Sequence, residues 1–125
     1  MSNRIFHGEF TSADASALSE PNSRFTLYEY GGTSTITLGA TDTAVISDLT
    51  IVTGAALTVT VYDGADNTVD AGEVIARGNF PANGGETHKS GCPHSCQIGT
   101  YPKIKTSGAG QIDGVVRGYI QKSGG

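Results

Sequence analysis

Tryptophan is absent from this chain of 125 residues, and cysteine and methionine are nearly so, with two residues and one residue. No apolar run approaches the roughly 18 residues that a membrane-spanning helix needs. The first segment, MSNRIFHGEF, lacks the apolar centre of a signal peptide. We therefore expect a protein with no membrane segment and no export signal.

Several enzyme signatures are also missing. The motifs G-x-x-x-x-G-K-[ST], G-x-S-x-G and H-E-x-x-H do not occur, and the glycines fall in expected turns and strands. The chain has only three histidines, and no pattern assembles them with a nucleophile and an orienting group. We therefore expect no enzymatic activity, no catalytic residues and no cofactor.

Charged residues are scarce, at 16% of the chain against about 25% in an average globular protein. The net charge of -4 is unevenly divided: residues 1–80 carry three basic and ten acidic side chains, and residues 81–125 carry five basic and two acidic ones. Distant segments pair in a β fold, so we expect these charges to mix over the surface. The overall acidity argues against a nucleic-acid partner, which usually meets a basic stripe with stacking aromatics.

Glycine and threonine are abundant, with 18 and 15 residues. Threonine, like valine and isoleucine, suits a half-buried pleated surface, and glycine suits tight turns. The length fits a single domain with a core of its own. Composition therefore favours strands joined by short connections.

Apolar and polar residues alternate in short segments along most of the chain, which is the pattern of half-buried strands. The clearest segment is 57–64, in which Leu57, Val59 and Val61 are expected to face inward and Tyr62 outward. The expected strands, of which the first two form a hairpin, are 24–30, 33–39, 43–52, 57–64, 73–80, 85–90, 101–108 and 111–120. About eight strands at this spacing predict an all-β fold: a single-domain antiparallel sandwich that is jelly-roll-like.

One of these strands has an irregular pattern. Residues 43–52 place Val45 and Leu49 on one face and Ile46 on the other. Such a strand is either buried on both faces or bulged near residues 47–48.

The last expected strand carries two glycines on its buried face. Within 111–120, Gly114 and Gly118 alternate with apolar residues on that face. An absent side chain in a strand indicates a bulge or the close approach of another backbone. The apolar residues of this face are Ile112, Val116 and Ile120.

The beginning of the chain carries a segment without strand character. Residues 11–23, TSADASALSEPNS, are small and polar and supply little apolar area to offset the entropy of ordering. We assign residues 1–23 to an N-terminal arm or loop, residues 24–121 to the β-sandwich domain and residues 122–125 to a C-terminal tail. The first segment is either an arm that reaches a neighbouring subunit or a surface loop tied to its own domain.

Both cysteines and two of the three histidines fall in one stretch, GETHKSGCPHSCQIG. Zinc accepts such soft and borderline ligands, so His88, Cys92, His94 and Cys96 are candidate metal ligands. The ion would be held within one chain or shared around a symmetry axis. Structural zinc sites usually use two separated ligand pairs, however, whereas these four residues come from one short segment.

The two cysteines allow other interpretations. A Cys92–Cys96 disulfide would close a tight ring, for which Gly91 and Pro93 supply sharp bends, in an oxidising milieu such as a released particle meets. Unpaired thiols in an ordinary loop are a further interpretation. A Cys–His nucleophile would need an orienting group and an oxyanion hole, and only His94 lies near Cys92 in the sequence.

A second polar segment, YDGADNTVDAGE, holds Asp63, Asp66, Asp70 and Glu73. Oxygen-rich loops bind calcium. The EF-hand spacing is not met, because Ala65 stands where a ligand is required. Aspartate and asparagine also make the local hydrogen bonds of turns, so calcium binding and an ordinary turn both remain open.

Three stretches, GAALTVTVYDGADNTVDAGEVIARGNF, PANGGETH and GTYPKIKTSGAGQIDGVVRGYI, resemble small β-rich virion proteins of tailed bacteriophages. These are the capsid decoration (cement) proteins and related head accessory proteins. The likeness covers about residues 44–121 and consists of short Thr/Val strands, small-residue turns and the closing strand VVRGYI. It implies a jelly-roll-like β domain, often a homotrimer, on the outside of a capsid where major capsid proteins meet.

The sequence thus predicts a non-enzymatic structural virion protein that decorates and stabilises a phage capsid through subunit interfaces. Its expected partners are the major capsid protein or other virion proteins and further copies of the chain, with no nucleic acid and no membrane. The expected location is the capsid exterior, after synthesis in the host cytoplasm.

Two alternatives remain. The first is a jelly-roll binding module, spike or lectin-like, for a host-surface glycan or receptor; Tyr28, Tyr30, Tyr62 or Tyr101 would then have to line a common groove. The second is a metal-dependent enzyme built on the four candidate metal ligands.

Overall fold

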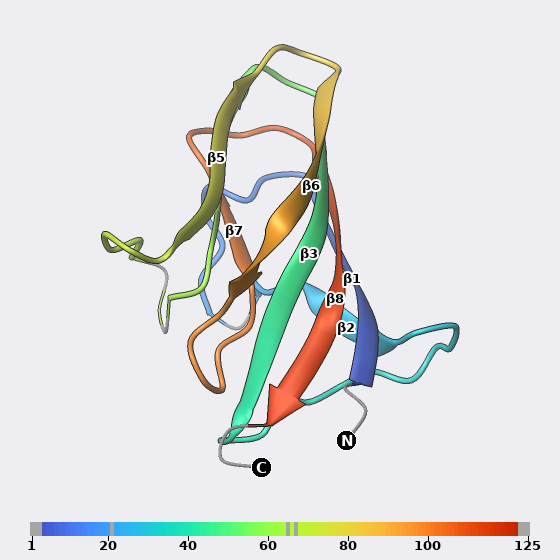
Figure 1. Ribbon diagram of the computed structural model, residues 1–125. Helices are drawn as coiled ribbons and strands as arrows, with labels where there is room; N and C mark the ends of the chain where they lie inside the picture. The colour runs from blue at the N-terminus through green and yellow to red at the C-terminus, as the bar shows by residue number, and fades with distance from the viewer. Residues whose placement is uncertain (1–3, 21, 65, 67, 123–125) are drawn as a thin grey trace.

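The computed structural model describes residues 4–20, 22–64, 66 and 68–122, without the side chains of residues 86–93. This part of the chain forms eight β-strands and no helix (Figure 1). The strands are β1 (Arg4–Ser12), β2 (Thr26–Glu29), β3 (Asp42–Thr53), β4 (Leu57–Tyr62), β5 (Val74–Phe80), β6 (Gly84–Ser95), β7 (Lys103–Thr106) and β8 (Ile112–Lys122).

Two antiparallel sheets pack face to face. The larger sheet has the order β2-β1-β8-β3-β6 and the smaller one β5-β4-β7. In Figure 1 β5 and β7 lie on one side of the molecule and β3, β6 and β8 on the other. The first and last strands pair along their whole length, so strands distant in sequence are neighbours in the sheet. This arrangement confirms the predicted all-β, jelly-roll-like sandwich.

The chain just before β2 joins the edge of the smaller sheet. Arg24 forms an antiparallel bridge with Lys103 of β7, and the Phe25 N–H donates to the Pro102 carbonyl at 3.0 Å. The chain then crosses to the larger sheet, where β2 pairs with β1. The predicted hairpin partner 33–39 makes only a single bridge with β2, between Thr35 and Tyr28. Its Ile36 and Leu38 are nevertheless buried on one face, as predicted.

The core lies between the sheets, and β4 and β8 supply its most regular rows. Leu57, Val59 and Val61 are all buried, which confirms the predicted inward face of β4. On β8 the predicted buried residues are likewise inside: Ile112, Val116 and Ile120. At about 25 cal/mol for each Å² of apolar surface, these rows are a main source of folding free energy.

Tyr62 was predicted to lie on the solvent-facing side of β4, and the expected exposure is wrong. Its side chain is 0% exposed. The β4–β5 ladder shifts register between Val61 and Tyr62, so that Val61 faces Ala76 while Tyr62 faces Val74. The extra residue of this bulge, Ile75, belongs to β5, and the β4–β7 ladder stays regular through Val61 and Tyr62. Tyr62 therefore keeps the face opposite Val61, and other segments of the chain cover it there.

A second bulge in β3 confirms the predicted irregularity at residues 47–48. Both ladders of β3 shift register between Ile46 and Asp48. The extra residue places Ile46 and Leu49 together in the core between the sheets. The alternation suggested that Val45 and Leu49 lie on the same face of the strand. This is wrong, because the bulge between them exchanges the two faces.

The glycines of β8 mark close approaches, as predicted. A Cβ added at Gly118 would lie 1.8 Å from the Val45 carbonyl oxygen, next to the bulge of β3. A Cβ at Gly114 would lie 2.9 Å from the Phe25 ring. Backbone and aromatic ring thus occupy the space that a side chain would need.

Residues 4–12 were assigned to an arm or loop, but they form β1, which pairs with β2 and β8 inside the larger sheet. Phe6 and Phe10 point into the core and are 0% and 6% exposed. The inward position between them is Gly8, against which Leu27 and Val116 pack. Because glycine has no apolar side chain, Gly8 interrupts the apolar–polar alternation by which a strand is recognised in the sequence.

The remainder of the assigned arm folds back on its own domain. Asp14 bridges Gly110, and Ala15 and Ser23 are 1% exposed. Of the two predicted possibilities, the surface loop tied to its own domain describes these residues.

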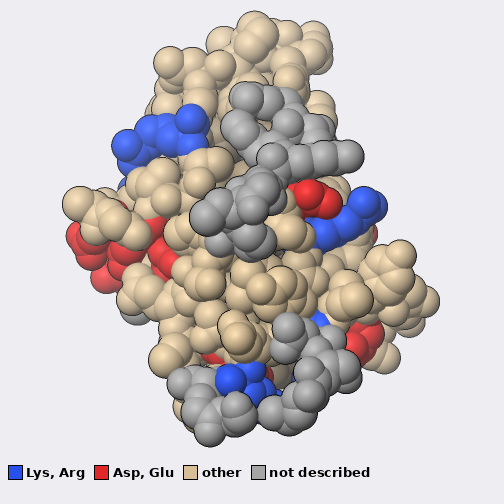
Figure 2. Space-filling view, in the orientation of Figure 1, with Lys and Arg blue, Asp and Glu red and all other residues tan. Residues whose placement is uncertain are grey.

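Charged groups of the acidic and basic parts of the chain meet in the folded protein. Lys122 Nζ lies 3.0 Å from Asp42 Oδ1, and Lys103 Nζ lies 3.0 Å from Glu20 Oε2. On the face drawn in Figure 2, basic and acidic groups form small separate patches with no continuous basic stripe among the described residues. The uneven distribution of charge along the sequence therefore does not produce one acidic and one basic side of the surface.

Asp42 makes stability depend on pH. Its carboxylate accepts hydrogen bonds from the Gly39 N–H at 2.8 Å and from Lys122 Nζ at 3.0 Å, and these bonds lower the pKa of the carboxyl from its ordinary value of 3.8. A lowered pKa stabilises the fold above pH 3.8, and that contribution is lost as the pH falls through the lowered value.

We expect the melting temperature of the Asp42→Asn variant to fall less steeply between about pH 5 and pH 2 than that of the unaltered protein. The matched control is Asp113→Asn, at an exposed position of β8. Circular dichroism melts at several pH values measure both slopes. Equal slopes for Asp42→Asn and the unaltered protein would refute this role.

Candidate functional site

One end of the sandwich brings the ends of β4 and β6 together. Asp63 follows β4 directly. His94 is the next-to-last residue of β6 and pairs with Ile46 of β3, and Cys96 comes just after β6. The Cys96 N–H donates to the Ala44 carbonyl at 2.9 Å, which fixes the chain beyond β6. Residues 31 to 33 positions apart in sequence therefore meet across the two sheets.

Asp63 is the centre of this cluster, and its side chain is 3% exposed. Its Oδ2 lies 3.2 Å from His94 Nε2 and accepts the Gln97 N–H at 3.2 Å. Its Oδ1 is buried and finds no hydrogen-bond partner among the described residues. A buried carboxylate oxygen without a partner is costly, so this atom requires an explanation.

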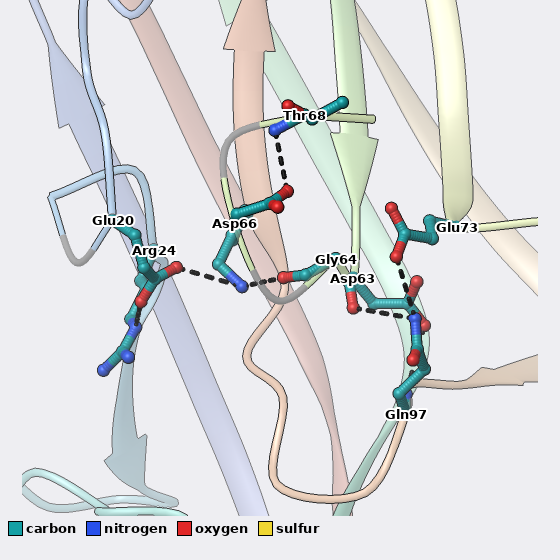
Figure 3. Close-up of polar contacts among 9 residues, drawn as sticks. Glu20, Arg24, Asp63, Gly64, Asp66, Thr68, Glu73 and Gln97 are labelled. Carbon is teal, nitrogen blue, oxygen red and sulfur yellow. Dashed lines mark hydrogen bonds and ion pairs between the residues drawn. The ribbon is translucent and has the colours of Figure 1, made fainter. Parts of the chain in front are cut away.

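Gln97 holds the cluster to the acidic connection between β4 and β5. Its Nε2 donates to the Asp63 carbonyl at 3.4 Å and to Glu73 Oε2 at 3.2 Å. The Asp63 N–H donates in turn to the Glu73 carbonyl at 3.0 Å. Figure 3 shows Gln97 reaching both Asp63 and Glu73. The Asp63 side chain is thereby held in one position.

Cys96 is a free thiol, 4% exposed. Burial, and then the negative charge of Asp63, raise the pKa of the thiol far above its ordinary value. A reactive nucleophilic cysteine needs the opposite shift. The side chain of Cys92 lies outside the described residues, so the predicted Cys92–Cys96 disulfide stays a prediction.

Of the four candidate metal ligands, the structure brings two together with a residue that the sequence did not associate with them. Asp63, His94 and Cys96 each offer a ligand atom, and these atoms lie within 4.8 Å of one another. The side chains of His88 and Cys92 lie outside the described residues. The sequence did mark Asp63 as part of the turn that ends the clearest strand. It did not show which distant strand this turn would meet.

The acidic connection itself has the hydrogen bonds of a turn. The Thr68 N–H donates to Asp66 Oδ1 at 2.9 Å (Figure 3). The Asp70 N–H donates to Glu73 Oε1 at 2.9 Å. These bonds agree with the turn interpretation of the segment. Asp63 points instead into the protein, and its side chain is buried.

A buried ion pair lies near the acidic connection. Lys103 is 2% exposed, and its ammonium group contacts Glu20 Oε2 at 3.0 Å and donates to the Gly64 carbonyl. Glu20 also pairs with Arg24, and Figure 3 shows these two residues on the side of Gly64 away from Gln97. Burial lowers the pKa of the Lys103 ammonium. The pair connects the loop before β2 with β7 and is a structural feature.

The outer face of the smaller sheet carries an open polar groove of about 260 Å³. Arg77 donates from Nε to Thr60 Oγ1 at 3.2 Å within it. The lining residues are Thr58, Thr60, Val69, Arg77, Lys105, Thr106 and Ser107.

The fully buried Tyr62 cannot contribute to the aromatic groove that a glycan-binding module would require. Tyr101 makes contacts within the domain. Its hydroxyl accepts the Leu38 N–H at 2.8 Å, and the Arg24 guanidinium lies 4.4 Å from its ring centre.

The outer face of the larger sheet carries an apolar row. Ile5 of β1 is 56% exposed and sits opposite Tyr119 of β8 in the ladder. Tyr30, 69% exposed, continues the row, because its N–H donates to the Ile5 carbonyl at 3.2 Å. Residues paired across a ladder share one face, so the exposed Tyr30 and Ile5 and the half-buried Tyr119 form a single apolar row, Tyr30–Ile5–Tyr119.

Comparisons with protein-family models, with curated proteins and with solved structures gave no match. Within the described part of the chain, no helix has the length and apolar character needed to cross a membrane. The class of the molecule is therefore defined by its own fold, a jelly-roll-like β-sandwich.

Proposed function

We propose that this chain is a non-enzymatic structural virion protein that decorates the outside of a bacteriophage capsid as a homotrimer. The observation that carries the proposal is the apolar row Tyr30–Ile5–Tyr119 on the larger sheet. Jelly-roll sandwiches are common in viral capsid proteins, which is support by analogy. The resemblance of residues 44–121 to capsid decoration proteins also supports the proposal.

The apolar row would act by being buried. Aromatic side chains are enriched at protein interfaces, where one flat surface removes much apolar area from water. Burial between symmetry-related copies closes a trimer, and contact with the major capsid protein or other virion proteins stabilises the shell by mass action. The proposed location is the capsid exterior, after synthesis in the host cytoplasm.

The environment of Cys96 supports a non-enzymatic role. Its thiol is buried, and burial together with the charge of Asp63 raises its pKa, which is opposite to the shift that an attacking cysteine nucleophile needs. The surrounding polar groups of Gln97 and Glu73 bond to one another and to Asp63, as structural groups do.

The proposal is tested by mixing the purified chain with undecorated capsids of the phage that encodes it. We expect binding and a rise in the melting temperature of the capsids. Ile5→Ser should weaken binding and trimerisation by at least tenfold, since it removes an apolar side chain from the row. Ile98→Ser is a matched control, because Ile98 is also 56% exposed but lies in the loop after β6.

Absence of binding by the unaltered protein would refute the proposed function. Equal loss of binding in the Ile5→Ser and Ile98→Ser variants would refute the assignment of the apolar row as the interface. Circular dichroism of both variants shows that they are folded before they are compared.

A second candidate function is a binding module for a host-surface glycan or receptor. The groove on the smaller sheet favours it, because Arg77 donates to the Thr60 hydroxyl there and Thr58 also lines the groove. A glycan array decides between the two candidates. Binding that is lost in an Arg77→Ala variant would support the module and oppose decoration.

A further inference from the structure

We propose that Asp63, His94 and Cys96 form a zinc site that joins the two sheets of the sandwich. Zinc is bound by thiolate sulfur, imidazole nitrogen and carboxylate oxygen, and one of each is present here. The site goes beyond the proposed function, since it concerns the isolated chain and does not depend on a capsid.

The distances suit a tetrahedral ion after small side-chain movements. Zinc–ligand bonds of about 2.0 to 2.3 Å place the ligand atoms of a tetrahedral site roughly 3.4 to 3.6 Å apart. The ligand atoms of the three residues lie within 4.8 Å of one another. His94 Nε2 is 3.2 Å from Asp63 Oδ2, so an ion bound by Oδ1, the other oxygen of this carboxylate, would lie close to the imidazole. Rotation of the half-exposed His94 side chain and of the Cys96 thiol closes the remaining difference.

The unpartnered oxygen of Asp63 independently indicates a missing cation. Asp63 Oδ1 is buried and has no hydrogen-bond partner among the described residues, although the side chain is 3% exposed. Protein carboxylates buried this deeply are normally paired with a charge or coordinate a metal. The His94 imidazole contacts the other oxygen, Oδ2, so it does not satisfy Oδ1.

Charge balance also fits zinc. One Zn²⁺ with the Asp63 carboxylate and a Cys96 thiolate makes a neutral group, which is less costly to bury than a lone carboxylate. The thiol proton passes to solvent when the ion binds. The fourth position would be taken by water, because His94 leaves 32% of its side chain exposed at the edge of the site.

Supporting contacts around the three ligands resemble the outer shell of a metal site. The Gln97 N–H donates to Asp63 Oδ2, and the Gln97 side chain is itself held by Glu73. Such contacts orient ligands before the ion arrives. Because Asp63 follows β4 and His94 belongs to β6, the ion would connect the smaller sheet to the edge of the larger sheet.

Titration of chelator-treated protein with Co²⁺, which replaces zinc and has visible and near-ultraviolet absorption, tests the site. We expect one ion per chain, a thiolate-to-cobalt charge-transfer band and displacement of that band by Zn²⁺. With free zinc at about 100 times its dissociation constant, the melting temperature should rise by about 10 °C. The unaltered protein alone is enough for this measurement.

Variants identify the ligands. Cys96→Ser should abolish the charge-transfer band, and Asp63→Asn should weaken binding by at least tenfold. Asp66→Asn is the matched control, because Asp66 lies in the same connection and bonds only locally; it should bind as the unaltered protein does. No charge-transfer band in the unaltered protein, or an undiminished band in Cys96→Ser, would overturn the proposal.

Discussion

Replacing Gly118 by alanine is expected to remove a large part of the stability of the domain. The added Cβ would lie 1.8 Å from the Val45 carbonyl oxygen and 2.9 Å from its carbonyl carbon. β8 and β3 are both interior strands of the larger sheet, so neither can move away without breaking ladders on both sides. We expect a loss of about 4 kcal/mol or more in the free energy of unfolding, from a total of about 5 to 15 kcal/mol for a domain.

Urea unfolding followed by circular dichroism measures this loss. Gly108→Ala is the matched control, since a Cβ at Gly108 meets nothing within 4 Å. The control should change stability by less than about 0.5 kcal/mol. A Gly118→Ala variant as stable as the control would show that β3 and β8 do not approach each other as the bulge at residues 47–48 requires.

The second large effect is expected from Glu20→Gln. This change removes the counter-charge of Lys103, whose side chain is 3% exposed, and leaves its ammonium group with neutral acceptors only. Breaking a buried ion pair by removing one partner costs about 3 to 5 kcal/mol, and we expect a loss of about 3 kcal/mol because Glu20 is partly exposed.

The same substitution at an exposed pair is the control. Glu29 pairs with Arg4, and their side chains are 39% and 49% exposed, so Glu29→Gln should cost less than about 1 kcal/mol. Adding Lys103→Met to Glu20→Gln should recover part of the loss, since no charge is then buried. Equal costs for Glu20→Gln and Glu29→Gln in urea unfolding would contradict the account of the buried pair.

Most of the fold could be predicted from the sequence, because apolar residues at every second position of a strand indicate which side chains are buried. Val59 and Val116 are inside as expected, and the two β8 glycines lie at close approaches. The broken alternation at residues 47–48 even located a bulge. These features are local, so neighbouring residues carry the information.

The errors occur where glycine or a bulge interrupts the alternation. Gly8 stands at an inward position of β1, so the strand between Phe6 and Phe10 was taken as part of an arm or loop. The bulge at residues 47–48 exchanged the faces of Val45 and Ile46. Tyr62 is buried on the outer face of β4 by segments that the alternation of β4 does not report. A side chain's face beyond such a break depends on the partner strand, which single-sequence patterns do not contain.

The candidate site shows the same limit. The concentration of cysteine and histidine at 85–99 drew attention to His94 and Cys96, which the structure places beside each other. Their neighbour Asp63 lies more than 30 positions earlier, and only the packing of the smaller sheet on the larger one brings it to them. Spacing along the chain indicates ligands from one segment, whereas this cluster is made by two sheets.

The central claim is that this sandwich acts through its outer surface on a capsid. An electron cryo-microscopy map of phage particles that carry the chain tests this claim most directly. We expect density for the jelly-roll-like domain on the outside of the shell, in groups of three, with Ile5 and Tyr30 at a contact. A map that finds the domain inside the particle or absent from it, or that leaves the apolar row facing solvent, would contradict the claim.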